Sequence, residues 1–197
     1  MFPERIETER LQLERLSARN VDVLALYEHC SHHNPDIEEL TEYLTWKPHE
    51  TPKETADFVR TVEESWDAHE DATYAIRPRE GEPQAGEFAG AAGLHFEWDR
   101  RSADLGTWLR KPFWGRGYSG ERAAALMELA FDRLDLEVVS VTHAVGNEKS
   151  RRAIEKYVER AGGRCEGTLR NFEVYPDGPV DVRRYTVTRE EWETGRD

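Results

Sequence analysis

Apolar and polar positions along the chain follow a helical period in some segments and a period of two in others. Alternating leucines over 11–16 predict a short strand. Helical spacing then predicts helices over about 21–30, with Ser17 and Asn20 as candidate caps, and over 37–44. The run Thr51-Pro52-Lys53-Glu54 matches a capping box with proline at the first helical position, so a third helix is expected to begin there.

From residue 72 the period changes to two, with strand-like runs starting at 72 and over 88–98 and 103–109, separated by a turn-rich stretch. These runs predict an antiparallel meander. A helix with Ala123, Met127, Ala130 and Leu134 on one face, a strand over 138–145 and a helix over 148–161 follow, which favours a parallel crossover. A final hairpin is expected over 164–187. The pattern predicts one mixed α/β domain over residues 1–197 with a central sheet.

Composition narrows the classes of function. The 197 residues carry 40 acidic and 27 basic side chains, for a net charge of −13, and the arginine pairs are scattered among acids. Such a surface repels polyphosphate, so we expect neither a nucleic-acid partner nor a basic RNA-binding module. No apolar run approaches the length of a membrane span, and the two cysteines form no CxxC pair. We therefore expect a cytoplasmic protein without a membrane partner, either a monomer or a homodimer.

The acidity is poor in lysine, since only five of the 27 basic residues are lysines. Two interpretations remain open: an ordinary acidic cytosolic protein, or a protein of a salt-rich cytoplasm whose self-repulsion is screened by salt. The second hypothesis predicts a melting temperature that rises between low and molar salt.

The segment most informative about chemistry joins a predicted strand to a predicted helix, with glycines at 115, 117 and 120. Glycines at a helix start let backbone N–H groups approach an anion. The segment is neither a Walker loop, because no GK[ST] follows, nor a dinucleotide fingerprint, because the glycine spacing differs. By itself it is equally compatible with a purely structural turn.

Trp114-Gly115-Arg116-Gly117-Tyr118-Ser119 resembles the W-G-x-G-Y-[A/S] loop of RimJ/RimL-type acetyltransferases, a branch of the GNAT superfamily. Thr8-Glu9-Arg10-Leu11, the segment over 46–55, Asn147-Glu148-Lys149-Ser150 and Glu166-Gly167-Thr168-Leu169-Arg170 resemble further motifs of that branch, in the same order. One departure is a stretch of four extra residues, 158–161, which is expected to lengthen the preceding helix by one turn.

The resemblance implies a GNAT-like fold, a mostly antiparallel sheet splayed at the cofactor site with helices on both faces, and acetyl-CoA as acetyl donor without a metal. Main-chain groups of Trp108, Leu109 and Arg110 would align the pantetheine arm and polarise the thioester carbonyl. The pyrophosphate and the rest of the donor would be held by the residues Trp114, Gly115, Arg116, Gly117, Tyr118, Ser119, Gly120, Glu121, Asn147 and Ser150.

Two residues are candidates for catalysis by the same resemblance. Ser150 would interact with the leaving thiolate, although a small polar residue in the first turn of a helix capped by Asn147 needs no catalytic role. Glu173 would act as a base through water, although a solvated strand carboxylate is the commoner fate of a glutamate. If Glu173 is not the base, His95 or His143 becomes preferable, and both otherwise suit core or cleft-edge positions.

Other reactive side chains are expected to have structural roles. Tyr157 falls three residues after the usual tyrosine acid of acetyltransferases and is interpreted as a packing residue. His32, His33 and Cys30 lack a fourth metal ligand, so they are assigned to a loop over the acceptor cleft.

The resulting hypothesis is an N-acetyltransferase that acetylates an amine, foremost the α-amine of a protein N-terminus such as that of a ribosomal protein. A small amine, such as a polyamine or an antibiotic, is an alternative acceptor. A non-catalytic CoA-binding domain is a further alternative, because a fold does not fix a function.

Overall fold

The computed structural model describes residues 1–195, which form one eight-stranded sheet in the order β1-β2-β3-β4-β5-β6-β8-β7. Neighbouring strands are antiparallel except β5 and β6, which are parallel and joined through α4. The strands are β1 Arg5–Glu7, β2 Leu11–Arg15, β3 Asp71–Pro78, β4 Gly90–Glu97, β5 Ser102–Leu109, β6 Val138–Ala144, β7 Arg164–Tyr175 and β8 Gly178–Thr188. The predicted meander, crossover and final hairpin are confirmed.

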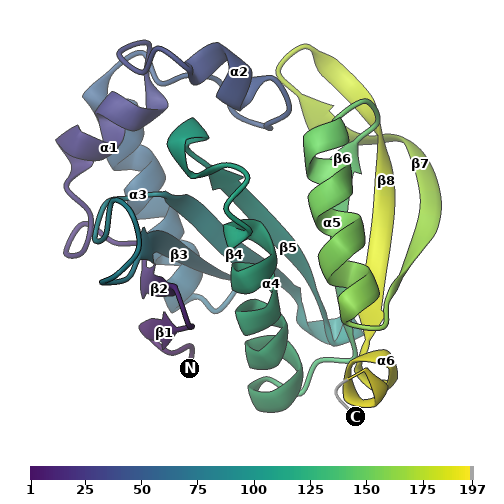
Figure 1. Cartoon of the computed structure of the whole chain (residues 1–197). Coiled ribbons are helices and arrows are strands. Elements are labelled where there is room, and N and C mark those ends of the chain that lie inside the picture. Colours follow the sequence, from purple (N-terminus) through teal and green to yellow (C-terminus); the bar gives the residue numbers. More distant parts are fainter. Residues whose placement is uncertain (196–197) are drawn as a thin grey trace.

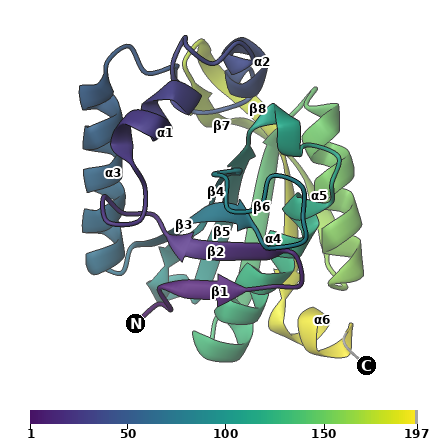
Figure 2. The same cartoon turned by 60° about the vertical axis from the view of Figure 1, so that its left-hand side comes forward.

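Helices cover both faces of the sheet (Figures 1 and 2). They are α1 Val23–Cys30, α2 Ile37–Thr41, α3 Pro52–Asp67, α4 Tyr118–Glu128, α5 Glu148–Arg160 and α6 Arg189–Thr194. The larger buried cluster joins the inner faces of α4, α5 and α6 to one side of the sheet, and a smaller cluster packs α1 and α3 against the other. Among residues 1–195, no helix combines the length and hydropathy needed to cross a bilayer.

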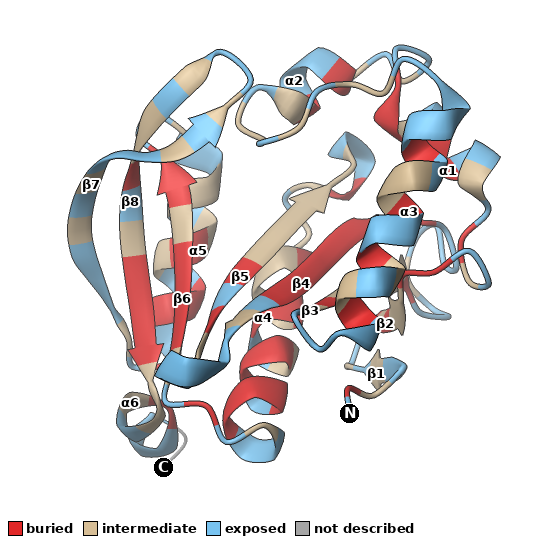
Figure 3. Cartoon of the chain, turned by 180° about the vertical axis from the view of Figure 1, so that it is seen from behind, coloured by how far each residue is buried: buried red, intermediate tan, exposed pale blue. Residues whose placement is uncertain are grey.

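The sheet opens between its two parallel strands. Register pairs join β5 to β6 only from Ser102–Val138 to Asp104–Ser140, and beyond Asp104 the strands diverge. Figure 3 shows the two halves of the sheet separating at this point, with buried residues continuing on both halves. The predicted splay is therefore a short parallel ladder followed by an open edge of β5.

Three helix starts differ from the sequence prediction in their chemistry. Asp22, rather than Ser17 or Asn20, caps α1 through a 2.8 Å bond from the Ala25 N–H. At α3 the helix begins at Pro52 as expected, but the Thr51 hydroxyl donates to the Glu54 carboxylate and caps no backbone N–H. A complete capping box forms at the start of α6, which the predicted tail did not include.

Candidate active site

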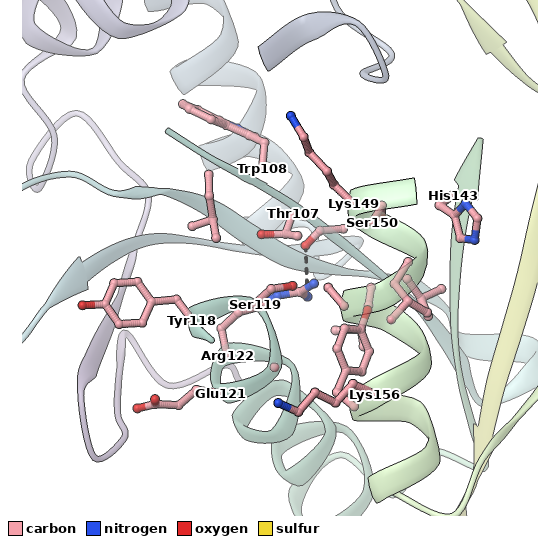
Figure 4. Close-up of a pocket in the computed structure, with 18 of the residues that line it drawn as sticks. Thr107, Trp108, Tyr118, Ser119, Glu121, Arg122, His143, Lys149, Ser150 and Lys156 are labelled. Atoms are coloured by element: carbon pink, nitrogen blue, oxygen red, sulfur yellow. Dashed lines mark hydrogen bonds between the residues drawn. The ribbon is translucent and has the colours of Figure 1, made fainter. Parts of the chain in front are cut away.

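A cleft of 2150 Å³ runs through the opening between β5 and β6. On one face of the sheet it is bounded by α4 and α5, whose side chains point toward one another across it (Figure 4). On the other face it is bounded by residues of β4, β7 and the segment around α2. The cleft therefore has two halves that meet at the open edge of β5.

The glycine loop presents an unusual density of free N–H groups. Gly115 and Gly117 have φ of 75° and 82°, a left-handed conformation that glycine adopts without steric cost. Among residues 1–195, the backbone N–H groups from Gly115 to Ser119 have no hydrogen-bond acceptor, while those of Gly120 and Glu121 bond to the Gly117 carbonyl. The N–H groups that are free for an anion thus lie over 115–119, whereas those of Gly120 and Glu121, which the resemblance included, are not free.

The start of α4 is fixed by the turn between β1 and β2. The Glu121 carboxylate accepts bonds from the Thr8 hydroxyl at 2.5 Å and from the Arg10 N–H and Nε, both at 2.7 Å. Arg10 also donates to the Arg116 carbonyl at 2.9 Å. The Thr8–Leu11 motif and Glu121 therefore hold the loop in place, and the Glu121 side chain is occupied in that role.

Basic side chains beside the loop are paired within the protein. Lys111 contacts Asp36 at 2.9 Å and Glu39 at 2.7 Å, and Arg110 donates to the Phe88 carbonyl at 2.7 Å. The ammonium group of Lys149 lies 4.4 Å from the centre of the Trp114 ring, which links the loop to α5. Because these cations already have partners, the N–H groups of the loop are its principal uncommitted donors.

Main-chain direction along β5 decides which of its groups face the opening. The Arg110 N–H donates to the Ala89 carbonyl, so alternation turns the N–H groups of Trp108 and Arg110 toward β4. Those of Thr107 and Leu109 point to the opposite edge, where β6 has diverged. The Leu109 carbonyl accepts the Trp114 indole at 2.6 Å. Thr107, which the sequence did not single out, and Leu109 therefore carry the N–H groups available to a bound substrate.

Ser150 lies in the first turn of α5 and lines the cleft near Thr107 (Figure 4). The Asn147 side chain accepts the Ser150 N–H at 3.0 Å and caps the helix, as predicted. The cap fixes the backbone of this turn and leaves the serine hydroxyl free to face the opening. The structure thus accommodates both the capping role and a role toward the leaving group.

Across the open edge lies a cluster of titratable groups, Asp71, His95, Asp104 and Glu173, from four different strands. Asp71 bonds His95 Nδ1, and a Cβ placed on Gly106 of β5 would lie 3.9 Å from His95 Nε2. The hydrogen bond to Asp71 raises the pKa of His95. Burial and the Asp104 charge raise the pKa of Glu173. The cluster can therefore bind an ammonium group and accept its proton.

Two other candidates are part of the core. His143 is buried and lies 3.3 Å from the Tyr185 hydroxyl, and Tyr157 is buried between α4 and α5. Both are buried as predicted, and both also line the cleft. Sequence reasoning missed a third buried residue of the cleft, Arg122, whose side chain is 1% exposed. Its place next to a glycine loop on a predicted helix gave no sign that it points inward.

Comparisons with known proteins agree with this geometry. The family model described as an acetyltransferase (GNAT) domain matches residues 10–157. YdaF of Bacillus subtilis, provisionally named a ribosomal N-acetyltransferase, is 36% identical over 110 residues, or 55% of this chain and 57% of that relative's length.

Solved structures also match over most of the chain. One is described as an acetyltransferase of T. thermophilus, with a TM-score of 0.75 and 29% identity, covering 100% of this chain and 95% of the other. RimL, described as a ribosomal-protein α-N-acetyltransferase in complex with coenzyme A, has a TM-score of 0.78 at 21% identity, covering 94% and 98%. At that identity the second match shows a shared fold.

Proposed function

Because this chain belongs to the GNAT acetyltransferase family, we propose that it transfers the acetyl group of acetyl-CoA to an amine, foremost the α-amine of a protein N-terminus. The observation that carries the proposal is the placement of five free N–H groups, over 115–119, beside the open edge of β5. The free N–H groups suit a pyrophosphate, and the open strand edge suits the extended arm of coenzyme A, which contains amides.

Acetyl-CoA supplies the activated carbonyl and a thiolate leaving group. The N–H groups of residues 115–119 bind its pyrophosphate, and those of Thr107 and Leu109 align its arm and polarise its carbonyl. Ser150 faces the sulfur from the start of α5. The residues present thus fit the donor without requiring any rearrangement of the loop, whose conformation is already set by Arg10 and Glu121.

The acceptor amine enters from the opposite face, where Asp104 and Glu173 favour a cation. Its ammonium form must lose a proton before its nitrogen can attack the thioester carbon. Glu173 and the Asp71-oriented His95 accept that proton, and the new C–N bond forms as the C–S bond breaks. An α-amine has a pKa of about 7.7–8.0, against about 10.4 for lysine, so a base of raised pKa suffices for it.

The names of YdaF and RimL support a ribosomal-protein acceptor, and we propose this class before polyamines or antibiotics. The experiment is an acetyl-CoA turnover assay with N-terminal peptides, polyamines and aminoglycosides as acceptors. We expect turnover with peptides that carry a free α-amine and none with the same peptides blocked at that position. Turnover of small amines alone would overturn the acceptor class. Acetyl-CoA binding without any turnover would favour the non-catalytic alternative.

Substitutions on the acceptor face separate chemistry from binding. Glu173→Gln and His95→Gln should each lower kcat by about 10²-fold or more, the usual contribution of general acid–base catalysis. The matched control is Glu64→Gln, because Glu64 is an exposed carboxylate on α3, outside the cleft lining. If both cleft variants retain the rate and pH profile of the wild type, the assignment of the base to this cluster is wrong.

A further inference from the structure

Arg122 is the largest fully buried side chain of residues 1–195, and no carboxylate lies within ion-pair distance of it in that range. Within residues 1–195, its Nη1 donates to the Gly106 carbonyl at 3.4 Å, its guanidinium lies beside the Tyr157 side chain, and its Nε has no partner. The neighbouring carboxylate in sequence, Glu121, is committed to Thr8 and Arg10 on another side of α4. Burial lowers the pKa of Arg122 but leaves an arginine charged.

A buried charge without a counter-charge is costly to a folded protein. Tyr157 cannot supply the counter-charge at neutral pH: its ring centre lies 5.7 Å from the guanidinium, and burial raises the pKa of its hydroxyl. Arg122 lines the cleft together with Thr107 and Ser150, and Figure 4 shows its guanidinium in the space between α4 and α5. The structure therefore holds a pre-positioned cation facing the half of the cleft that receives the donor.

The position of Arg122 along β5 indicates which negatively charged group it faces. Gly106 follows the end of the β5–β6 ladder by two residues and precedes Thr107, whose N–H faces the opening. The pyrophosphate is accounted for by the N–H groups over 115–119, toward the other end of β5. Two atoms gain negative charge during acetyl transfer: the thioester oxygen, which the proposed function assigns to the N–H groups of Thr107 and Leu109, and the departing sulfur, which is therefore the charge left for Arg122 to meet.

We infer that Arg122 is a catalytic residue that stabilises the thiolate of coenzyme A as it leaves. This inference rests on the proposed function and names the group that meets the charge of the leaving atom. When the C–S bond breaks, its electron pair stays on sulfur, the guanidinium keeps all its protons, and the thiolate takes its proton from solvent afterwards. Ser150 adds a hydrogen bond to the same atom.

The test titrates the thiol of coenzyme A bound to the protein, followed by the ultraviolet absorbance of the thiolate. A free thiol of this kind has a pKa of about 8.5. We expect a lower value when coenzyme A is bound to the wild type, a return of about one unit or more toward 8.5 in Arg122→Met, and a value near the wild type in Arg122→Lys. Arg60→Met, an exposed arginine on α3, is the matched control.

Kinetics provide the second measurement. Arg122→Met should lower kcat by about 10²-fold, the cost of removing one preorganised group that stabilises developing charge, with little change in the affinity for desulfo-coenzyme A, which lacks the sulfur. A wild-type complex whose bound thiol titrates at or above 8.5 overturns the inference without any variant. A loss of desulfo-coenzyme A affinity with an unshifted thiol pKa also overturns it, since Arg122 would then act on the phosphates or the fold. Absence of turnover in a wild type that still lowers the thiol pKa would contradict the proposed function alone.

Discussion

Arg122→Met should make the free protein more stable although it makes the enzyme slower. In the free state Arg122 is 1% exposed, and within residues 1–195 its guanidinium meets the Gly106 carbonyl at 3.4 Å and the Tyr157 ring but no carboxylate, so much of its hydration is lost without an ionic replacement. Replacing buried ionic groups by apolar ones of similar volume often raises the free energy of unfolding by about 1–4 kcal/mol. Methionine matches the length of the stem, and Gly106 keeps its register partner Gly93.

The variant also loses one long hydrogen bond, which is worth about 1 kcal/mol or less. After this loss is subtracted, we expect the free energy of unfolding to rise by about 2 kcal/mol. In a domain of this size that corresponds to a rise in Tm of roughly 4–8 °C. The assay is thermal unfolding followed by circular dichroism at neutral pH without coenzyme A, with Arg60→Met expected within about 0.5 kcal/mol of the wild type. A Tm equal to or below that of the wild type would refute the reasoning, because Arg122 would then be well compensated in the free protein.

Three further predictions concern the loop, the acceptor face and the sheet. Gly117→Val should weaken coenzyme A binding, measured by calorimetry, about tenfold or more. A side chain in the left-handed conformation of Gly117 costs about 1–2 kcal/mol, and relief of that strain would move the free N–H groups. Gly86→Ala, in open space away from the cleft, is the control and should leave the affinity intact. Asp71→Asn should shift the acidic limb of the kcat/KM profile to lower pH, since Asp71 raises the pKa of His95 and only neutral His95 accepts a proton; an unmoved limb would exclude His95 as the base. Gly90→Ala should lower the unfolding free energy by about 2–3 kcal/mol in urea titrations, because its Cβ would lie 2.2 Å from the Trp108 carbonyl oxygen, and a neutral effect would contradict the close approach of β4 and β5.

The fold was predictable because its longest elements are periodic and its motifs are local. The helical face of α4 and the β-branched run of β6 each carry enough apolar positions to identify the element, and the glycine loop lies between two such elements. The short strand β1 was missed because three residues carry no period, and α6 because its capping box spans only four positions. The capping residue was predicted wrongly where several polar residues precede a helix, as Ser17, Asn20 and Asp22 do before α1.

The candidate site was less accessible to sequence reasoning, because its decisive properties are relations between distant strands. Nothing near His95 in the sequence indicates that Asp71, on the neighbouring strand, orients its ring. Thr107 was missed because strand alternation decides which N–H groups face the opening, and that alternation depends on the register with β4. Arg122 was missed because an arginine within a helix is ordinarily exposed, and its burial follows from the packing of α4 against α5.

The distribution of charge within the cleft resolves a difficulty posed by the acidic surface. A net charge of −13 repels a polyanionic donor, and Lys111 beside the loop does not counter it, since it is paired with Asp36 and Glu39. The α4–α5 face still offers donors to an anion: the N–H groups over 115–119 and the guanidinium of Arg122, beside basic side chains such as Arg152 and Lys156 that also line the cleft. On the other face, the carboxylates of Asp104 and Glu173 favour a cation, and Glu173 and His95 can accept its proton. β5 thus separates a half-cleft suited to an anion from one suited to an ammonium group, and its open edge is the place where the two reacting atoms can meet.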